Sequence, residues 1–525
     1  MRPRSLVIAA ALVASGALVP AVASSPTNTA AGCDPKRPAV AYYPGGKLLF
    51  PQPRNAPIPC ASSTGFGSAE SHIAVTASGA VVFTPAVVPS GTLGTGELDV
   101  PVGRPSQHNA NPAGIAISRN NGQSWKLVRP SGVTWNPTDH GDYVDPVTDR
   151  LYFEDYGPIP LAPSLGPGQE GPAHINVSAD EGVTWTHTTI PAVVLPENPR
   201  FTSAVAPQGQ PQPHGYPRVT YFCANVNVGF VSPAIAGRTC YRSMDGGLVW
   251  KLTSVILSGS APIHSECSTN GEKYSAIDGY YPQPAPDGSL YLMVACGTQT
   301  FLARSQDEGA TFPVLHLQSQ PITLPVPNGG VPELRIDSRG VMYLMWSLGA
   351  TGGGLPGGAT TKLGLRISKD SGRTWGPSID LTPPKVTTMR DVSWELHGPG
   401  EIAAGILGRR AGQVGYDGLL VASRNILSDR PVIYSGILND PRRPLLFSAD
   451  VTGSGYILLP GLPPIAYPPP FGFNFAGNDF IGTTYAPDGT PWASFTQDCG
   501  PAPDAPQCVK QQDQTRGIAG RLMWR

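Results

Sequence analysis

Five carboxylates recur along the chain at comparable points, each just before or at the start of an apolar stretch that is typical of a β-strand. They are Asp142, Asp278, Glu333, Asp391 and Asp479. Two carboxyl groups that face each other suit the cleavage of a glycosidic bond, one as acid and the other as base or nucleophile. Because an Asp before a strand also commonly caps a turn, each position taken alone has a purely structural explanation as well.

Side chains that suit a sugar ligand accompany these carboxylates. They are His72, Tyr143, Arg218, Tyr280, Arg390 and Trp394. Aromatic rings offer flat apolar faces, and His and Arg donate hydrogen bonds. We therefore predict catalysis by a pair of the carboxylates, substrate binding by these six side chains, and no cofactor or metal. Ca²⁺ bound by Asp oxygens is an alternative, although no D-x-D-x-D loop supports it.

The elements that must position these residues are seven similar units, each a short strand, a turn and an apolar strand. The units are His72–Val82, Tyr143–Glu154, Tyr216–Asn225, Tyr280–Ala295, Pro332–Trp346, Val392–Leu407 and Phe480–Phe495. Most of the turns contain a Gly, which adopts positive φ readily, whereas the second unit turns through Thr148-Asp149 and the third also lacks a Gly.

A second pattern, here named the repeat turn, lies between the units and occurs five times. The copies are Ser118–Trp125, Ser178–Trp185, Ser243–Trp250, Ser305–Phe312 and Ser368–Trp375, and their first residues lie 60, 65, 62 and 63 positions apart. In each copy an Asp, or Asn120 in the first, can accept hydrogen bonds from the turn's own amides. The Gly two places later suits positive φ, and the final aromatic residue anchors the turn. A fixed period of this size indicates a repeat architecture.

The repeat turn resembles the Asp-box, S-x-D-x-G-x-T-W, also called the bacterial neuraminidase repeat. The resemblance covers roughly residues 70–525 and implies a sialidase-like β-propeller: all-β, a single ring of four-stranded blades. The count of units predicts seven blades, with six as the alternative. The resemblance does not identify a reaction, because the repeat occurs in glycosidases, sorting receptors and assembly factors alike.

Sialidases, as the resemblance implies, hold the substrate carboxylate with three arginines and use a Tyr nucleophile, a Glu partner and an Asp acid/base. Their first Arg lies in an Arg-Ile-Pro motif, which this chain lacks. Pro199-Arg200-Phe201 and Arg430-Pro431-Val432 are poor substitutes in the wrong places. The sequence therefore does not predict a true sialidase.

The seventh unit ends at Gly517–Trp524 and lacks a fourth strand. An open ring would expose two sheet edges, and propellers often close by borrowing a strand from the other terminus. The segment Val40–Phe50 is largely apolar and precedes the first unit, so we expect it to supply the missing strand.

Antiparallel strands alternate in direction, so the Gly turns and the repeat turns should share one face. The residues before each first strand then surround a funnel mouth on the opposite face. The long loop Thr84–Pro112 overhangs that mouth and is a lid or subsite candidate, or simply a variable insertion.

The composition and the N-terminal sequence limit where the protein can act and which partners it can bind. Two arginines, an apolar run and Ala21-Val22-Ala23 make residues 1–23 a predicted signal peptide, followed by an N-terminal segment, 24–69, and the propeller, 70–525. The formal net charge is −1, which argues against a nucleic-acid partner. We expect a secreted monomer that binds a carbohydrate or glycoconjugate and has no membrane span.

The eight cysteines predict disulfides, because an even number in an exported chain favours oxidation. We expect pairs between neighbours along the chain: Cys33–Cys60, Cys223–Cys240, Cys267–Cys296 and Cys499–Cys508. None has C-x-x-C spacing, so a zinc site or a redox motif is not indicated.

Two functions remain open. The first is a glycoside hydrolase or polysaccharide lyase with its site in the funnel mouth. The second is a non-catalytic propeller that binds a glycan or a protein outside the cell. Facing carboxyl groups roughly 5–10 Å apart would favour the enzyme, whereas ordinary salt bridges across the ring would favour the binder.

Overall fold

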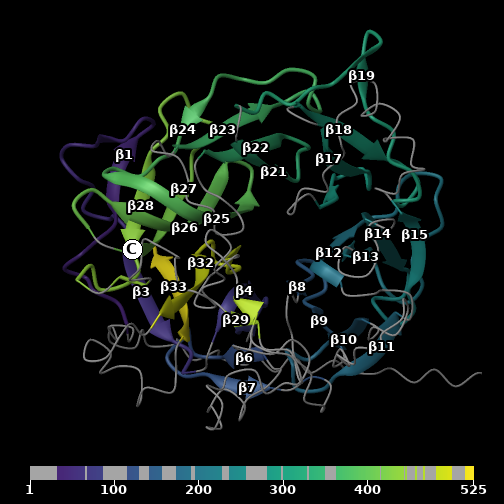
Figure 1. Ribbon diagram of the computed structural model, residues 1–525, viewed down its shortest axis with the longest axis horizontal. Coiled ribbons are helices and arrows are strands. Elements are labelled where there is room, and N and C mark those ends of the chain that lie inside the picture. Colours follow the sequence, from purple (N-terminus) through teal and green to yellow (C-terminus); the bar gives the residue numbers. More distant parts are fainter. Residues whose placement is uncertain are drawn as a thin grey trace, which may run out of the picture.

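The computed structural model describes residues 32–65, 68–86, 115–128, 130, 141–156, 173–190, 196–227, 236–255, 281–296, 299–327, 330–348, 362–413, 415–442, 444–445, 456–457, 465–466, 481–498 and 515–525. Within these ranges the regular elements are β-strands and no helix occurs. Figure 1 shows the strands grouped as sheets around a central axis. The prediction of an all-β propeller with seven blades is confirmed.

The first three blades each contain four antiparallel strands that follow one another along the chain. The first blade is β4 (Ala69–Val75), β5 (Val81–Ala86), β6 (Ile115–Ser118) and β7 (Lys126–Val128). The second is β8 (Asp142–Val144), β9 (Leu151–Tyr156), β10 (Ala173–Ser178) and β11 (Thr186–Ile190). The third is β12 (Pro196–Ala204), β13 (Val219–Asn227), β14 (Ala236–Ser243) and β15 (Lys251–Val255).

Of the remaining four blades, the fifth keeps this plan, and the fourth, sixth and seventh vary it at their outer edges. The fourth is β16 (Gln283–Pro284), β17 (Leu290–Cys296) and β18 (Gln299–Ser305). The fifth is β21 (Gly330–Ile336), β22 (Met342–Leu348), β23 (Lys362–Ser368) and β24 (Ile379–Asp380). The sixth is β25 (Val386–Gly398), β26 (Glu401–Arg410), β27 (Asp417–Ser423) and β28 (Ile433–Ile437), extended by β1 (Val40–Tyr43) and β2 (Lys47–Leu48). The seventh is β31 (Gly482–Tyr485), β32 (Pro491–Asp498), β33 (Thr515–Met523) and β3 (Ile58–Ser63), and a separate two-stranded sheet joins β29 (Tyr456–Ile457) to β30 (Ile465–Ala466).

The first strands of the blades form the inner wall. Each contacts the first strand of the next blade, in the order β4, β8, β12, β16, β21, β25, β31 and back to β4. Residues on these seven strands are therefore the ones that approach the central axis (Figure 1).

The outer strand of the seventh blade comes from the N-terminal part of the chain, but not from the predicted segment. β3 pairs with β33, with Ile58 opposite Met523 and Ala61 opposite Gly520. The expectation for Val40–Phe50 is wrong, because β1 pairs with β28 on the sixth blade instead. Tyr42 explains this placement, since its side chain is fully buried and its hydroxyl donates to the Leu381 carbonyl oxygen of the neighbouring fifth blade at 2.6 Å.

The third blade begins earlier than the sequence indicated. Its inner strand is β12, whereas the predicted unit Tyr216–Asn225 contains the end of the β12–β13 connection and most of β13. The error has a physical cause: residues 205–218 replace the short Gly turn that marks most other units.

In the fourth blade the outer strand is interrupted. Leu315 N–H and Leu324 N–H donate to the carbonyls of Leu302 and Thr300, so two short segments cover the edge of β18. Between them the hairpin of β19 (His316–Leu317) and β20 (Gln320–Pro321) projects from the rim (Figure 1).

The repeat turns have a common hydrogen-bond pattern. In the second copy the Gly182 N–H donates to Ser178 Oγ at 2.8 Å, and Asp180 Oδ1 accepts the Thr184 N–H at 2.8 Å. Gly182 has a φ of +80°, and Glu181 before it also lies in the left-handed region at +57°. The sequence anticipated only the Gly, which adopts that conformation at no steric cost.

The turns between first and second strands do lie on the same face as the repeat turns. Thr76, in the turn of the first blade, donates to Glu181 in the second repeat turn at 3.1 Å. Arg150, in the turn of the second blade, donates to the Gly246 carbonyl in the third repeat turn at 2.7 Å. We name this side of the molecule the repeat-turn face.

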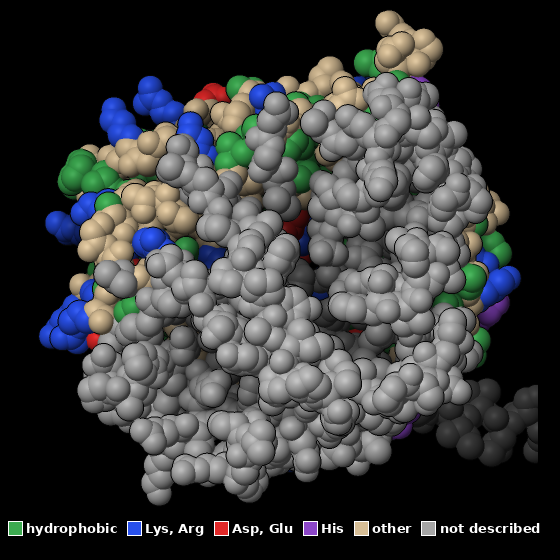
Figure 2. Space-filling model, viewed as in Figure 1, with side chains coloured by type: hydrophobic (Ala, Val, Ile, Leu, Met, Phe, Trp, Pro, Cys, Tyr) green, Lys and Arg blue, Asp and Glu red, His purple; other side chains and the backbone are tan. Residues whose placement is uncertain are grey.

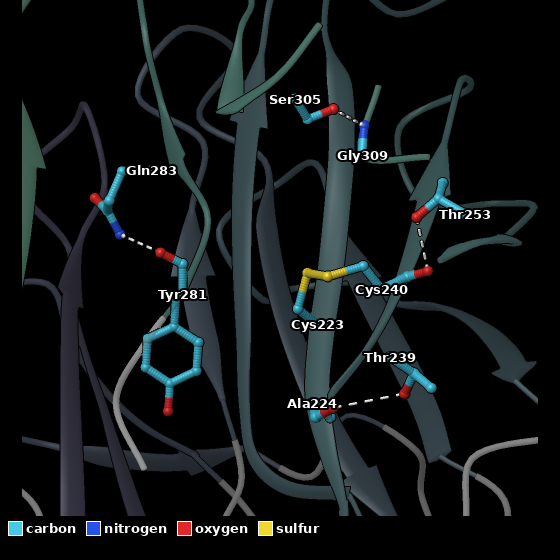
Figure 3. Close-up of a disulfide and its surroundings, with 9 residues drawn as sticks. All are labelled: Cys223, Ala224, Thr239, Cys240, Thr253, Tyr281, Gln283, Ser305 and Gly309. Atoms are coloured by element: carbon cyan, nitrogen blue, oxygen red, sulfur yellow. Dashed lines mark hydrogen bonds between the residues drawn. A yellow bond between two sulfur atoms is a disulfide. The ribbon is translucent and has the colours of Figure 1, made fainter. Parts of the chain in front are cut away.

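Two of the four predicted disulfides are confirmed, Cys33–Cys60 and Cys223–Cys240. The second joins directly opposite residues of β13 and β14, and Thr253 Oγ1 donates to the Cys240 carbonyl at 2.8 Å (Figure 3). Cys267, Cys499 and Cys508 and the side chain of Cys296 lie outside the described residues.

Candidate functional site

Asp142 begins β8 and faces the first blade. Its Oδ2 accepts a 2.6 Å hydrogen bond from Thr84 Oγ1 on β5. Burial raises the pKa of this carboxyl to about 6, against the opposing effects of the Thr84 hydrogen bond and the Arg200 charge. His72 on β4 is the cross-strand partner of Thr84, so it lies beside the same hydroxyl. A carboxyl with this pKa exchanges its proton near neutral pH, as an acid catalyst must.

Arg200 on β12 interacts with side chains of three other blades. Its guanidinium lies over the Tyr281 ring, 5.0 Å from the ring centroid. The same positive charge partly counteracts the rise that burial causes in the pKa of Asp142 in the second blade and of Glu333 in the fifth. Tyr281 directly precedes the fourth blade, where its carbonyl accepts a 3.4 Å hydrogen bond from Gln283 Nε2 (Figure 3).

Glu333 and Arg335 lie two residues apart on β21, and Arg335 reaches the sixth blade. Its guanidinium lies 3.4 Å from Glu333 Oε2 and 3.4 Å from Glu395 Oε2 on β25. It also donates to the Trp394 carbonyl at 3.2 Å and lies 5.3 Å from the Trp394 ring centroid. Burial raises the pKa of Glu333, although the Arg335 and Arg200 charges counteract it.

These contacts define a group that we name the axial cluster. It consists of Asp142, Arg200, Tyr281, Glu333, Arg335 and Glu395. All six lie on, or directly before, the first strands of blades two to six. Acidic and basic side chains are visible near the middle of the molecule in Figure 2.

Three predicted residues lie beside the cluster on β25. Trp394 is 1% exposed, and Asp391 Oδ1 accepts the Val392 N–H at 2.8 Å. Arg390 is 9% exposed, and within the described ranges no hydrogen-bond partner lies near its Nε. A register shift between Met389 and Asp391 changes the alternation of side chains at this point of the strand.

Two predicted binding residues do not join the cluster through any described contact. Tyr143 forms a 2.9 Å hydrogen bond with Ser203, in the seam between blades two and three. Arg218 lies in the β12–β13 connection, where it donates to Ser203 Oγ at 2.8 Å and approaches Asp145 Oδ2 at 3.7 Å. Since that connection joins a first to a second strand, Arg218 lies at the repeat-turn face, and its placement at the funnel mouth is wrong.

The other predicted residues cannot be placed. Asp278, Tyr280, Asp479 and most of the loop Thr84–Pro112 lie outside the described residues. In the part of the chain that is described, no three His, Cys, Asp or Glu side chains come together as a metal site would require. None of the described segments is a helix long and apolar enough to cross a membrane.

Sequence reasoning missed Glu395 and rejected Arg200. Glu395 carried a usable signal, because it is a charged residue inside a long strand whose neighbours Trp394 and Leu396 are apolar. Arg200 carried none, since a long connection follows β12 in place of a short turn, and the partners of Arg200 lie on three other blades.

No family model and no curated protein sequence matches this chain. Among solved structures, the NanB sialidase from Streptococcus pneumoniae is 11% identical with a TM-score of 0.39, covering 76% of this chain and 70% of that one. An α-L-arabinanase from Penicillium chrysogenum is 12% identical with a TM-score of 0.37, covering 72% and 97%. A protein of unknown function from Dyadobacter fermentans is 14% identical with a TM-score of 0.38, covering 72% and 97%.

Proposed function

We infer that the chain is a glycoside hydrolase whose reaction takes place at the axial cluster. The observation that carries this proposal is a pair of carboxyls, Asp142 and Glu333, on first strands of different blades. Burial raises the pKa of both, and both lie within the field of Arg200. A protonated carboxyl and an ionised one are the two groups that hydrolysis of a glycosidic bond uses.

In this proposal Asp142 is the general acid. Its pKa of about 6 keeps a useful fraction protonated under mildly acidic conditions. Glu333, whose ionised form is stabilised by two arginines, serves as base or nucleophile. Tyr281 offers an aromatic face, and Arg200 donates to the sugar hydroxyls, whereas Trp394 is too deeply buried to contact a ligand directly.

A non-catalytic glycan-binding propeller is the second candidate, and one observation favours it. Arg335 forms ion pairs with both Glu333 and Glu395, which is an ordinary arrangement between neighbouring blades. If these pairs only hold blades five and six together, the cluster presents a polar surface without a reactive carboxylate.

We place either function outside the cell, because two disulfides suit an oxidising compartment. The proposal keeps the signal peptide at 1–23, the N-terminal segment at 24–69 and the propeller at 70–525, with a monomer as the working unit.

The test is hydrolysis of a panel of polysaccharides with analysis of the products. Asp142→Asn and Glu333→Gln are each expected to reduce turnover by about 10²–10⁴-fold while the protein stays folded. Asp370→Ala, in the fifth repeat turn, is the matched carboxylate control and should leave turnover per folded molecule unchanged. Binding without hydrolysis, retained by both axial variants, would support the binder instead.

A further inference from the structure

Three distant parts of the chain bring cationic side chains together on the outer rim of blades six and seven. Arg525 follows β33, and its guanidinium donates to the carbonyls of Arg54 at 3.5 Å and Pro35 at 3.4 Å. Arg37 Nη1 donates to the Asn439 carbonyl after β28 at 3.4 Å. Next to Asn439, Asp440 accepts from Arg442 at 2.9 Å. The N-terminal segment thus connects the ends of two blades.

We name this surface the rim patch. Its cationic side chains are Lys36, Arg37, Arg54, Arg442 and Arg525, all exposed. Its acidic side chains are Asp34 and Asp440, which are only partly exposed, at 40% and 37%. The patch therefore has an excess of positive charge on a chain whose net charge is −1. Figure 2 shows Lys and Arg side chains along the edge of the molecule where β1 and β3 lie in Figure 1.

The two carboxylates do not neutralise the patch. Side-chain and backbone hydrogen bonds from Arg442 lower the pKa of the Asp440 carboxyl to about 2, and the charges of Arg442 and Arg37 add to this effect. Arg442 nevertheless keeps 87% of its side chain exposed and Arg37 keeps 47%. The acids therefore orient the guanidinium groups while leaving their outer edges available to a ligand.

Phe50 adds an apolar surface to the same segment. Its side chain is 77% exposed, and it lies four residues before Arg54. Gln52 fixes this stretch, because its side chain exchanges hydrogen bonds with both Ala41 backbone groups at 2.7 and 2.9 Å. An exposed aromatic ring on the same segment as these cationic side chains suits a ligand with both apolar faces and negative charges.

We propose that the rim patch binds an acidic polysaccharide, a chain whose sugar units carry carboxylate or sulfate groups. The cationic groups are all exposed and come from three separate segments, which favours a polymer with repeated charges over a single small anion. Arg pairs well with carboxylate and sulfate oxygens, and Phe50 can pack against the apolar face of a sugar ring. The site is separate from the axial cluster and does not depend on the reaction there.

The probe is polygalacturonate, with neutral dextran, duplex DNA and phosphatidylglycerol vesicles as comparisons. The triple variant Lys36→Gln, Arg54→Gln, Arg442→Gln removes three charges and leaves the backbone-directed bonds of Arg37 and Arg525 intact. The matched control is Lys126→Gln, Lys251→Gln, Lys369→Gln, which removes three exposed charges from other blades. Affinity is measured by retardation in gels that contain each polymer, and folding by thermal unfolding.

We expect the rim variant to bind polygalacturonate about tenfold more weakly and the control variant to bind it normally. Binding should weaken with salt, and Phe50→Ala should reduce it without changing the charge. Equal losses in both triple variants, no retardation of the original protein, or equal or stronger binding to DNA or vesicles would each overturn the proposal.

Discussion

Thr84 and Asp142 join the first two blades through a single 2.6 Å hydrogen bond, with the threonine hydroxyl as donor and the carboxylate as acceptor. This bond stabilises the ionised carboxylate and so opposes the effect of burial, which leaves the pKa of Asp142 at about 6. The bond therefore contributes, against the larger effect of burial, to the pH at which the proposed acid loses its proton, and this contribution can be tested directly.

Thr84→Val removes that donor. The pKa of Asp142 should rise, so the alkaline limb of the pH–rate profile should move upward, by about one pH unit at most. Thr220→Val is the control, because Thr220 is equally buried on a second strand and its hydroxyl bonds Tyr152 instead. An unchanged limb in Thr84→Val would show that Asp142 does not control the rate.

Asp142→Asn should stabilise the protein at neutral pH. The folded-state pKa of about 6 exceeds the ordinary 3.8, so the folded state binds more protons and the free energy of unfolding falls as pH rises from about 4 to 6. The amide avoids this loss. We expect a gain of about 1–2 kcal/mol at pH 7 that disappears below pH 4, measured by urea unfolding across this range. A constant difference at all pH values would contradict the assignment.

Arg335→Met should destabilise the fold, because it leaves Glu333 and Glu395 facing each other without their shared cation. We expect a loss of about 2–3 kcal/mol, less than for a fully buried pair since all three side chains are partly exposed. Arg339→Met on the same blade, where the Arg is 56% exposed beside Asp337, should change stability by less than about 0.5 kcal/mol. Similar losses of stability in the two variants would show that the ion pairs of Arg335 contribute no more than an exposed surface pair.

Asp370→Ala should cost about 1–2 kcal/mol. The carboxylate accepts the Thr374 N–H at 2.8 Å and the Thr374 hydroxyl at 2.6 Å, and these bonds lower its pKa. Its contribution is present above the unfolded pKa and is lost as pH falls through the folded one. The difference in Tm between the variant and the original protein should therefore narrow in acid.

Tyr42→Phe tests the N-terminal segment. The phenol is fully buried and its hydroxyl donates across the blade boundary, so its loss leaves the Leu381 carbonyl without that donor. We expect a loss of about 1–2 kcal/mol in thermal unfolding. Tyr43→Phe, the neighbouring and partly exposed position, should have almost no effect. Equal Tm values for both variants would show that the Tyr42 hydrogen bond does not stabilise the attachment of the N-terminal segment to the fifth blade.

The fold was predictable wherever a local turn carries its own signal. The hydrogen bonds of each repeat turn join residues of the same turn, as Ser178 and Gly182 show. The turn can therefore be recognised from a short stretch of sequence. The third blade was misplaced because its inner strand, β12, leads into a long connection, residues 205–218, in place of a short turn. The choice between Val40–Phe50 and Ile58–Ser63 depends on which exposed edge each segment meets, and apolar content alone does not reveal that.

The site was predictable only in part for a related reason. Asp142 and Glu333 could be found because they stand near the starts of first strands. The charge of Arg200 acts on both carboxyls from a third blade. Such an interaction between blades produces no recognisable spacing of residues in the sequence. The bulge at Asp391 also shifts which residues of β25 face the same way, so alternation fails there.

The pairing of Ile58 with Met523 has a consequence for how the molecule is made. On the ribosome, residues 58–63 emerge long before residues 515–523 exist, so the seventh blade cannot be completed until those later residues have been synthesised. Pairings between residues so far apart in the chain are slow to form, because the entropy of closing a long loop must be lost first. We expect that, until β33 is synthesised, the nascent chain has an open ring whose exposed strand edges make it prone to aggregation.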